Sequence, residues 1–364
     1  MSALPLRLQR LTASLNALEV DAMLVTDEIN VRYLSAFTGD SSSLVVTPKE
    51  TTILSDGRYT AQISEQCSGI GTRIRTSNQL LRDLTSEVLG GCGVKRVGIE
   101  ADNMTLAEFQ FLEKGCEGIE FVPTRGVVEK LRVIKDEVEI TATRRAVEIA
   151  ERVFTELCPT FTAEHTEVAV AHEIEHRMRL LGAEGCSFAP IVAAGPGGAL
   201  PHYQPRNVAF ANHKSLLIDW GAKFEGYASD LTRTLHQQDV GDSFKRAYEG
   251  VLEAQLAAIE LIRPGMQVRD IDAAARAALD RHGILDAFSH GLGHGTGLQI
   301  HELPRMSPIS EEILASGMII TVEPGVYYDG DFGIRIEDDV LVTDSGHEVL
   351  STLPKGLDDC RFIL

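Results

Sequence analysis

The chain has 364 residues, of which 44% are hydrophobic and 24% charged, a composition typical of globular proteins rather than disordered or fibrous ones. Acidic residues number 53 and basic residues 34, so the formal net charge is −19. Such a charge repels a phosphate backbone and an anionic lipid surface, so we expect neither a nucleic-acid nor a membrane partner. No apolar run approaches the roughly 18 residues that a membrane span needs.

The first part of the chain, residues 1–130, alternates helical and strand patterns. The leucines at 8, 11, 15 and 18 repeat at helical spacing. Short apolar runs predict strands at residues 22–25, 44–47, 51–54, 96–99 and 119–123. Alternating helices and strands are typical of an α/β layer, so we predict a small α/β domain over residues 1–130.

A second domain is predicted over residues 131–364. Asp136 opens a long helical segment, and Glu137 and Glu139 in its first turn suit the helix dipole. Amphipathic helices are expected at residues 137–157, 165–181, 244–262 and 268–282. The strands between and after them form hairpins, so we predict an α+β domain with a largely antiparallel sheet.

Two acidic residues lie in the first hairpin of this domain. Asp219 belongs to the apolar run 215–220, and Asp230 lies in the returning strand. A turn centred between Phe224 and Glu225 would place Asp219 directly opposite Asp230, with their Cβ atoms about 5 Å apart. The apolar neighbours of Asp219 predict that this strand is buried.

Glu323 and Glu337 form a second acidic pair. Their midpoint is Gly330, inside the turn signal Asp329-Gly330, and the flanking strands are rich in Ile and Val. Two buried like charges about 4 Å apart repel by several kcal/mol at an effective dielectric of about 20. Four such carboxylates need protons, bases or metal ions, and their charge matches two divalent cations. We therefore favour a dinuclear metal site over solvated acids at strand edges.

The segment between the two hairpins, residues 288–302, combines glycine with histidine. Alternating glycines allow close backbone approach to a ligand, and imidazole beside carboxylates is a common ligand set for first-row metals. The spacing G-x-G-x-x-G is absent, so this is not a dinucleotide-binding loop. The residues are Gly291, Gly293, Gly295, Gly297, His290, His294 and His301.

With these residues in place, the chain resembles the pita-bread metallopeptidases, which include Xaa-Pro dipeptidase (prolidase), Xaa-Pro aminopeptidase, methionine aminopeptidase and creatinase. The similar segments are ALPHY at 199–203, DWGA at 219–222, SDLTRT at 229–234, GHGTG at 293–297, VEPG at 322–325 and GIRIED at 333–338. NVRYL at 30–34 and DGRY at 56–59 resemble the N-terminal domain of the proline-specific and creatinase branch. The resemblance implies a pita-bread catalytic domain with a curved antiparallel sheet, preceded by a smaller creatinase-like α/β domain.

Carried over residue by residue, the resemblance implies that two divalent metal ions are bound by Asp219, Asp230, His294, Glu323 and Glu337. Asp230 and Glu337 would bridge the two ions. The oxygen-rich ligand set favours Mn²⁺, with Co²⁺ or Zn²⁺ as alternatives. A water shared by the two ions would attack the scissile carbonyl, and Glu323 would carry its proton to the leaving proline nitrogen.

The resemblance also implies roles for residues around the metals. His202 and His301 would stabilise the tetrahedral oxyanion, and His290 would shape the proline pocket. Arg335 is a candidate for binding the substrate carboxylate, with Arg305 as a competing candidate. For each of these side chains, structural hydrogen bonding is the alternative role.

We therefore predict a metallopeptidase that cleaves before proline in a di- or oligopeptide, first of all a Xaa-Pro dipeptidase. A Xaa-Pro aminopeptidase acting on longer peptides is the alternative within the family, and a non-catalytic peptide- or protein-binding relative is the alternative outside it. The resemblance further implies a homodimer. Six dispersed cysteines without a C-x-x-C pair are expected to be reduced thiols in a cytoplasmic protein.

The segment 172–176, HEIEH, matches the H-E-x-x-H zinc motif. At 100° per residue, Val170, Ile174 and Met178 form the apolar face of this predicted helix, and His172 and His176 fall on the opposite face. We therefore predict a solvated helix surface here rather than a metal site.

Overall fold

The computed structural model describes residues 4–363 of the chain. Two units are distinguished, Met1–Arg132 and Val133–Leu364, and each builds its own hydrophobic core. All six cysteines are free, in agreement with the expected reduced thiols. Within the described residues, no helix has both the length and the apolar character that crossing a bilayer would require.

The N-terminal unit is built on a mixed six-stranded sheet with the order β4-β3-β2-β1-β5-β6. The predicted α/β layer is confirmed, and each predicted strand appears within about two residues of its expected bounds. Its strands are β1 (Ala22–Val25), β2 (Ser43–Val46), β3 (Thr51–Ser55), β4 (Gly71–Ile74), β5 (Arg96–Glu100) and β6 (Glu120–Thr124). Its helices are α1 (Leu4–Leu15), α2 (Glu28–Ser35), α3 (Thr60–Gln66), α4 (Leu81–Gly91), α5 (Leu106–Gly115) and α6 (Val127–Arg132).

A buried polar network explains the NVRYL segment in this unit. The Asn30 side chain donates to Glu100 at 2.7 Å and to Glu129 at 2.6 Å, and its oxygen accepts from Arg132 at 2.8 Å. Asn30 is fully buried, so these bonds satisfy both ends of its amide. They tie α2 to the end of β5 and to α6, which is a structural role.

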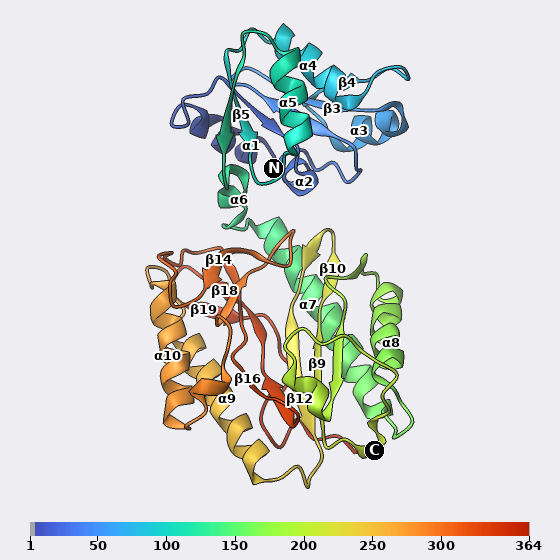
Figure 1. Ribbon diagram of the computed structural model, residues 1–364, viewed down its shortest axis with the longest axis vertical. Coiled ribbons are helices and arrows are strands. Elements are labelled where there is room, and N and C mark those ends of the chain that lie inside the picture. The colour runs from blue at the N-terminus through green and yellow to red at the C-terminus, as the bar shows by residue number, and fades with distance from the viewer. Residues whose placement is uncertain (1–3, 364) are drawn as a thin grey trace. The chain divides into compact units, whose positions relative to one another are not determined.

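The second unit contains four long helices and a set of short antiparallel strands (Figure 1). In Figure 1, α7 and α8 lie on one side of the strands, and α9 and α10 lie on the other. The helices are α7 (Glu137–Leu157), α8 (Glu167–Leu180), α9 (Asp242–Glu260) and α10 (Val268–Arg281). The strands are β7 (Gly185–Cys186), β8 (Ile191–Ala194), β9 (Ser215–Trp220), β10 (Ala222–Phe224), β11 (Tyr227–Ala228), β12 (Leu231–His236), β13 (Gly293–Gly295), β14 (Glu302–Met306), β15 (Ile319–Val322), β16 (Gly325–Tyr328), β17 (Phe332–Arg335), β18 (Asp338–Val342) and β19 (His347–Val349).

The strands of this unit group into small sheets on either side of its midline. One half contains β12-β9-β8 and β11-β10-β7, and the other contains β14-β13-β15-β18-β19 and β16-β17. Trp220 at the end of β9 is fully buried, stacks on Phe154 at 4.4 Å and donates to the Ala150 carbonyl at 2.9 Å. This contact fixes β9 against α7, and all six residues of β9 are buried, as predicted.

The register of the first hairpin differs from the prediction. Its turn is Glu225-Gly226, with φ of 48° and 86°, so both residues are left-handed, as in a two-residue type I′ hairpin. The centre of the hairpin therefore lies one residue later than expected, and Asp219 pairs with Thr232 rather than with Asp230. Asp230 is the diagonal neighbour of Asp219 on the same side of the sheet.

The register of the second hairpin is confirmed. β16 and β17 pair symmetrically about Gly330, from Tyr328 with Phe332 outward to Gly325 with Arg335. Gly330 has a φ of 75°, which a glycine adopts without steric cost. Glu323 and Glu337 both lie just beyond the open end of this ladder, two residues past the Gly325 and Arg335 pair.

A bridge joins the two halves of the unit. Thr232 on β12 pairs with Glu337, whose backbone nitrogen donates to the Thr232 carbonyl at 3.1 Å. Arg233 supports the same point, because its guanidinium donates to the Glu337 carbonyl at 2.7 Å and forms an ion pair with Asp338 at 2.7 Å. The two acidic hairpins are thereby held side by side.

Candidate metal centre

Carboxylates from both hairpins and one imidazole converge between the two halves of the second unit. Asp219 comes from β9, Asp230 directly precedes β12, His294 is the central residue of β13, and Glu323 and Glu337 flank the β16–β17 hairpin. Ligand atoms of Asp230, His294 and Glu337 all lie within 4.8 Å of one another. The structure thus brings residues more than 100 positions apart to one point.

The hydrogen bonding of His294 identifies which ring nitrogen is available. Nδ1 lies 3.0 Å from the Gly295 carbonyl, an acceptor only, so Nδ1 carries the hydrogen. Burial lowers the pKa of His294 to about 4, so the ring is neutral near pH 7. Its Nε2 lone pair therefore points toward Asp230 Oδ2 at 3.5 Å and Glu323 Oε1 at 3.4 Å.

Burial and mutual repulsion disfavour the charged forms of the clustered acids. Burial, followed by the charge of Glu337, raises the pKa of Asp230 well above its ordinary value. Burial and the charge of Glu323 do the same to the pKa of Glu337, and burial raises the pKa of Glu323 to about 7. Without a cation, these acids must take up protons to coexist.

The carboxylate of Asp219 forms an ion pair with Arg335. The Arg335 guanidinium donates to Asp219 Oδ2 at 2.6 Å, to Tyr327 Oη at 2.8 Å and to Thr232 Oγ1 at 3.1 Å. Burial raises the pKa of Asp219, and Arg335 opposes that rise. Tyr327 also lies 2.9 Å from His290 Nε2, so a chain of hydrogen bonds runs from Asp219 to His290.

The other predicted residues surround this cluster. His301 is exposed, and its ring centroid lies 4.4 Å from that of His294. Burial lowers the pKa of His301, and the next contribution comes from His202. His202 is exposed and close enough to act electrostatically on Asp219 as well. Arg305 pairs with His294 across the β13–β14 ladder and has an exposed side chain.

A further buried acid, Asp339, was missed by the sequence reasoning. It is fully buried, and its Oδ2 accepts from the Asp230 backbone nitrogen at 2.9 Å. Burial, followed by the charge of Asp338, raises the pKa of Asp339 well above its ordinary value. A sequence signal was present, because Asp339 follows Glu337 by two positions and so shares its side of the strand.

The residues present fit divalent metal ions. Asp219 Oδ1 is buried and has no hydrogen-bond partner among the described residues, and the charge of this carboxylate contributes to the raised pKa values of Asp230, Glu323 and Glu337. The His294 Nε2 lone pair also faces oxygens of Asp230 and Glu323, which are acceptors too. Because the hydrogen of the ring is on Nδ1, His294 has none to donate to these oxygens. A cation would satisfy these atoms together, and nitrogen and oxygen ligands suit first-row divalent ions.

The HEIEH motif at residues 172–176 does not form a metal site. His172 and His176 lie exposed on α8, while Val170, Ile174 and Met178 are buried, as the helical projection predicts. Within residues 4–363, the cluster of Asp230, His294 and Glu337 is the group whose ligand atoms lie close enough for a metal.

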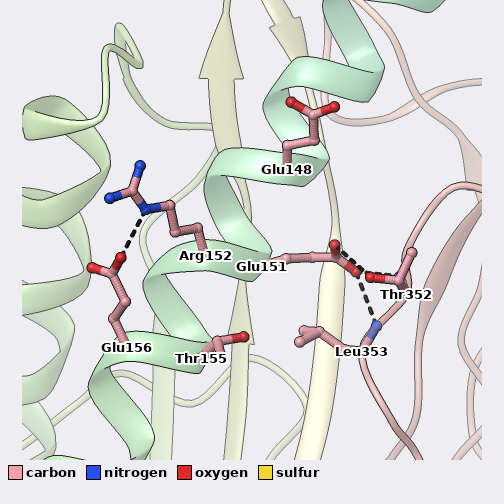
Figure 2. A pocket seen from close by; sticks show the side chains of 7 residues that line it. All are labelled: Glu148, Glu151, Arg152, Thr155, Glu156, Thr352 and Leu353. Carbon is pink, nitrogen blue, oxygen red and sulfur yellow. Dashed lines mark hydrogen bonds and ion pairs between the residues drawn. The ribbon is translucent and has the colours of Figure 1, made fainter.

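A surface hollow on the second unit lies along α7 and the C-terminal segment (Figure 2). Glu151 accepts hydrogen bonds there from Thr352 and Leu353, and Arg152 forms an ion pair with Glu156 at 2.7 Å. Its carboxylates are thus engaged in holding the C-terminal segment and the helix surface. None of the predicted site residues lines this hollow.

Comparison with known proteins identifies the family of the chain. Residues 141–344 match the description "Metallopeptidase family M24", and residues 7–134 match "Creatinase/Prolidase N-terminal domain". The chain belongs to metallopeptidase family M24. The recognised resemblance and the predicted fold, a creatinase-like domain followed by a pita-bread domain, are thereby confirmed.

Several M24 relatives match along nearly their whole length. A Xaa-Pro dipeptidase of Pyrococcus horikoshii is 32% identical over 339 residues, which cover 93% of this chain and 94% of the relative. The structure of a Xaa-Pro dipeptidase from Bacillus anthracis has a TM-score of 0.93 at 35% identity and covers 97% of this chain and 99% of its own. An X-Pro aminopeptidase structure from Thermotoga maritima has a TM-score of 0.88 at 32% identity and covers 97% of this chain and 100% of its own.

Membership in M24 makes the protein a metallopeptidase and implies divalent metal ions, for which the buried Asp, His and Glu cluster is the candidate centre. The catalytically silent alternative finds no support in the site, since none of the five predicted ligand positions is filled by a residue unable to bind a metal.

Proposed function

We propose that this M24 protein is a Xaa-Pro dipeptidase that uses two divalent metal ions, with Mn²⁺ favoured. The observation that carries the proposal is the meeting of the unprotonated His294 nitrogen with Asp230 and Glu323 in a buried cluster. Relatives named as Xaa-Pro dipeptidases support the substrate class.

The proposed metal ligands are Asp219, Asp230, His294, Glu323 and Glu337. Bound there, divalent ions would polarise the scissile carbonyl and lower the pKa of a water nucleophile toward neutrality. Glu323 would hold the proton released from that water at its carboxylate and pass it to the departing proline nitrogen. Thr321 donates to Glu323 Oε1 at 3.2 Å and so helps to orient this carboxylate.

The chain's own histidines would orient and stabilise the substrate. His301 and His202, both exposed beside the cluster, would donate hydrogen bonds to the oxygen that gains charge in the tetrahedral state. His290, held between Phe288 and Tyr327 with ring centroids at 4.9 and 5.5 Å, would form a wall of the proline pocket.

Two arginines remain candidates for the carboxylate of a dipeptide. All three guanidinium nitrogens of Arg335 already donate to Asp219, Tyr327 or Thr232, which makes Arg335 a buried counter-charge for the cluster. The Arg305 side chain is exposed, so it can reach a substrate without desolvating an existing pair. We therefore propose that Arg305 contacts the substrate carboxylate and that Arg335 acts through Asp219.

The decisive assay compares a Xaa-Pro dipeptide with the matching Xaa-Pro-Yaa tripeptide at equal concentration, in the presence of Mn²⁺. A dipeptidase prefers the dipeptide, because its free carboxylate pairs with the proposed arginine. Preference for the tripeptide would instead establish the aminopeptidase, the alternative that the Thermotoga maritima structure favours.

A variant links activity to the proposed bridging ligand. Asp230→Asn removes a negative charge at nearly constant shape, so we expect Xaa-Pro hydrolysis to be abolished while the protein stays folded. Asp239→Asn is the matched control, since Asp239 is an exposed carboxylate paired with Lys214 at 2.7 Å. Full activity of Asp230→Asn would contradict the bridging role.

The family resemblance leads us to propose a homodimer located in the cytoplasm. Light scattering of the purified protein tests the assembly: a mass near twice the 39.7 kDa chain is expected, and a monomer mass would contradict it.

A further inference from the structure

Helix α10 carries an ion pair between a half-buried arginine and a buried aspartate, next to the glycine- and histidine-rich segment. Asp272 and Arg276 lie four residues apart and are joined at 2.7 Å. Exposed pairs of this spacing add little to stability, but Asp272 is fully buried. A buried carboxylate without a strong partner is costly, so this pair has a fixed geometry and can hold other groups in place.

The pair contacts the backbone of residues 290–292 at both ends. Arg276 donates to the His290 carbonyl at 2.7 Å, and Asp272 Oδ1 accepts from the Leu292 nitrogen at 3.2 Å. The Arg276 guanidinium also lies 4.5 Å from the ring centroid of Phe288. One ion pair on α10 therefore fixes a short loop through a donor and an acceptor.

Besides the ion pair, this loop is held by Leu292, which is fully buried and whose carbonyl accepts from the Glu323 nitrogen at 2.8 Å. Gly291 at its centre has no side chain, and a Cβ there would come within 2.7 Å of the Met306 carbonyl. The His290 ring is placed by the Gly291 carbonyl, 2.7 Å from Nδ1, by the Phe288 ring and by Tyr327. A shift of the His290 carbonyl would therefore move the ring.

We propose that Arg276 is a positioning residue for proline selectivity, acting through His290. It touches no substrate; it holds the His290 backbone so that the imidazole forms a rigid pocket wall that fits a proline ring. The proposal rests on the pocket role of His290 in the proposed function. A positional effect of this kind changes the preference between substrates, whereas a loss of general stability lowers the rate with every substrate.

The test uses kcat/KM for Leu-Pro and for Leu-Ala, measured with the Mn²⁺-loaded full-length protein. Arg276→Lys keeps a cation beside Asp272 but has one nitrogen instead of a forked group, so the bond to the His290 carbonyl is lost. The lost hydrogen bond contributes about 1.4 kcal/mol, which corresponds to a factor of about ten in a rate ratio. We therefore expect the ratio of kcat/KM for Leu-Pro to that for Leu-Ala to fall about tenfold. Arg281→Lys is the control, since Arg281 is an exposed residue of α10 and pairs with the exposed Glu253 of α9.

A double-mutant cycle separates positioning from structure. His290→Ala should lower the same ratio, and adding Arg276→Lys should then lower it no further, because the group being positioned is gone. If the two effects add in full, or if Arg276→Lys lowers both substrates equally, the positioning role is overturned while the pocket role of His290 stands. If His290→Ala leaves the ratio unchanged, the pocket role and this proposal both fall.

Discussion

Removing the metal ions from the candidate centre should make the stability of the protein depend strongly on pH. In the protein without metal, burial and mutual repulsion raise the pKa values of Asp230, Glu323 and Glu337. Acids with raised folded pKa values bind more protons in the native state than in the unfolded state, so the free energy of unfolding falls as pH rises. The stability is present at low pH and is lost as the pH passes upward through the folded pKa values.

The size of this effect can be worked out for Glu323. Its pKa rises from an ordinary value of 4.5 to about 7, and each unit is worth about 1.4 kcal/mol, so Glu323 alone accounts for roughly 3 kcal/mol between pH 4.5 and pH 8. Asp230 and Glu337 act in the same direction. A loss of this size lowers the melting temperature by several degrees in a unit of this length.

The assay is thermal unfolding, followed by circular dichroism from pH 5 to pH 8, of chelator-treated protein and of protein saturated with Mn²⁺. The melting temperature without metal should fall with rising pH, and the gap to the Mn²⁺ form should widen. Glu323→Gln should reduce that widening. Glu348→Gln should not, because Arg144 lowers the pKa of this more exposed carboxylate. A gap that stays constant with pH would refute the reasoning.

Two further changes test the packing around the site, and a third tests the HEIEH motif on α8. Gly221→Ala places a Cβ 1.8 Å from a carbonyl of the facing strand, so we expect a loss of roughly 3 kcal/mol or more in unfolding free energy, and an unchanged denaturant midpoint would contradict it. Arg233→Met breaks a fully buried ion pair and should cost about 3–5 kcal/mol in urea unfolding, against less than about 1 kcal/mol for the half-exposed Arg144→Met control. The double variant His172→Ala/His176→Ala should keep full activity, and elemental analysis should find an unchanged metal content. Loss of activity or of metal would show that the HEIEH motif is a metal site.

Local signals in the sequence predicted the four long helices of the second unit and one of the two acidic hairpins. Asp136 caps α7 as part of a capping box with Glu139, and the observed helix has the predicted bounds, residues 137–157. The register of β16 and β17 follows from the Asp329-Gly330 turn signal, which places the centre of the hairpin at Gly330. Both features depend on neighbours in the chain.

The remaining features depend on contacts between distant residues or on uncommon backbone geometry. The first hairpin turns at Glu225, a non-glycine residue with positive φ, which residue preferences do not favour, so the Asp219 and Asp230 register was predicted wrongly. Asp339 was overlooked although its position two residues after Glu337 places it on the same strand face. The pairing of Arg276 with the His290 carbonyl links α10 to a loop and has no local signature.

The existence of two metal ions is tested most directly by a crystal structure of the Mn²⁺-loaded protein with anomalous diffraction recorded at the manganese absorption edge. Two anomalous peaks per chain, both within ligand distance of Asp230 and Glu337 and together contacting Asp219, His294 and Glu323, are the predicted result. A single peak, or peaks bound by other side chains, would contradict the dinuclear centre.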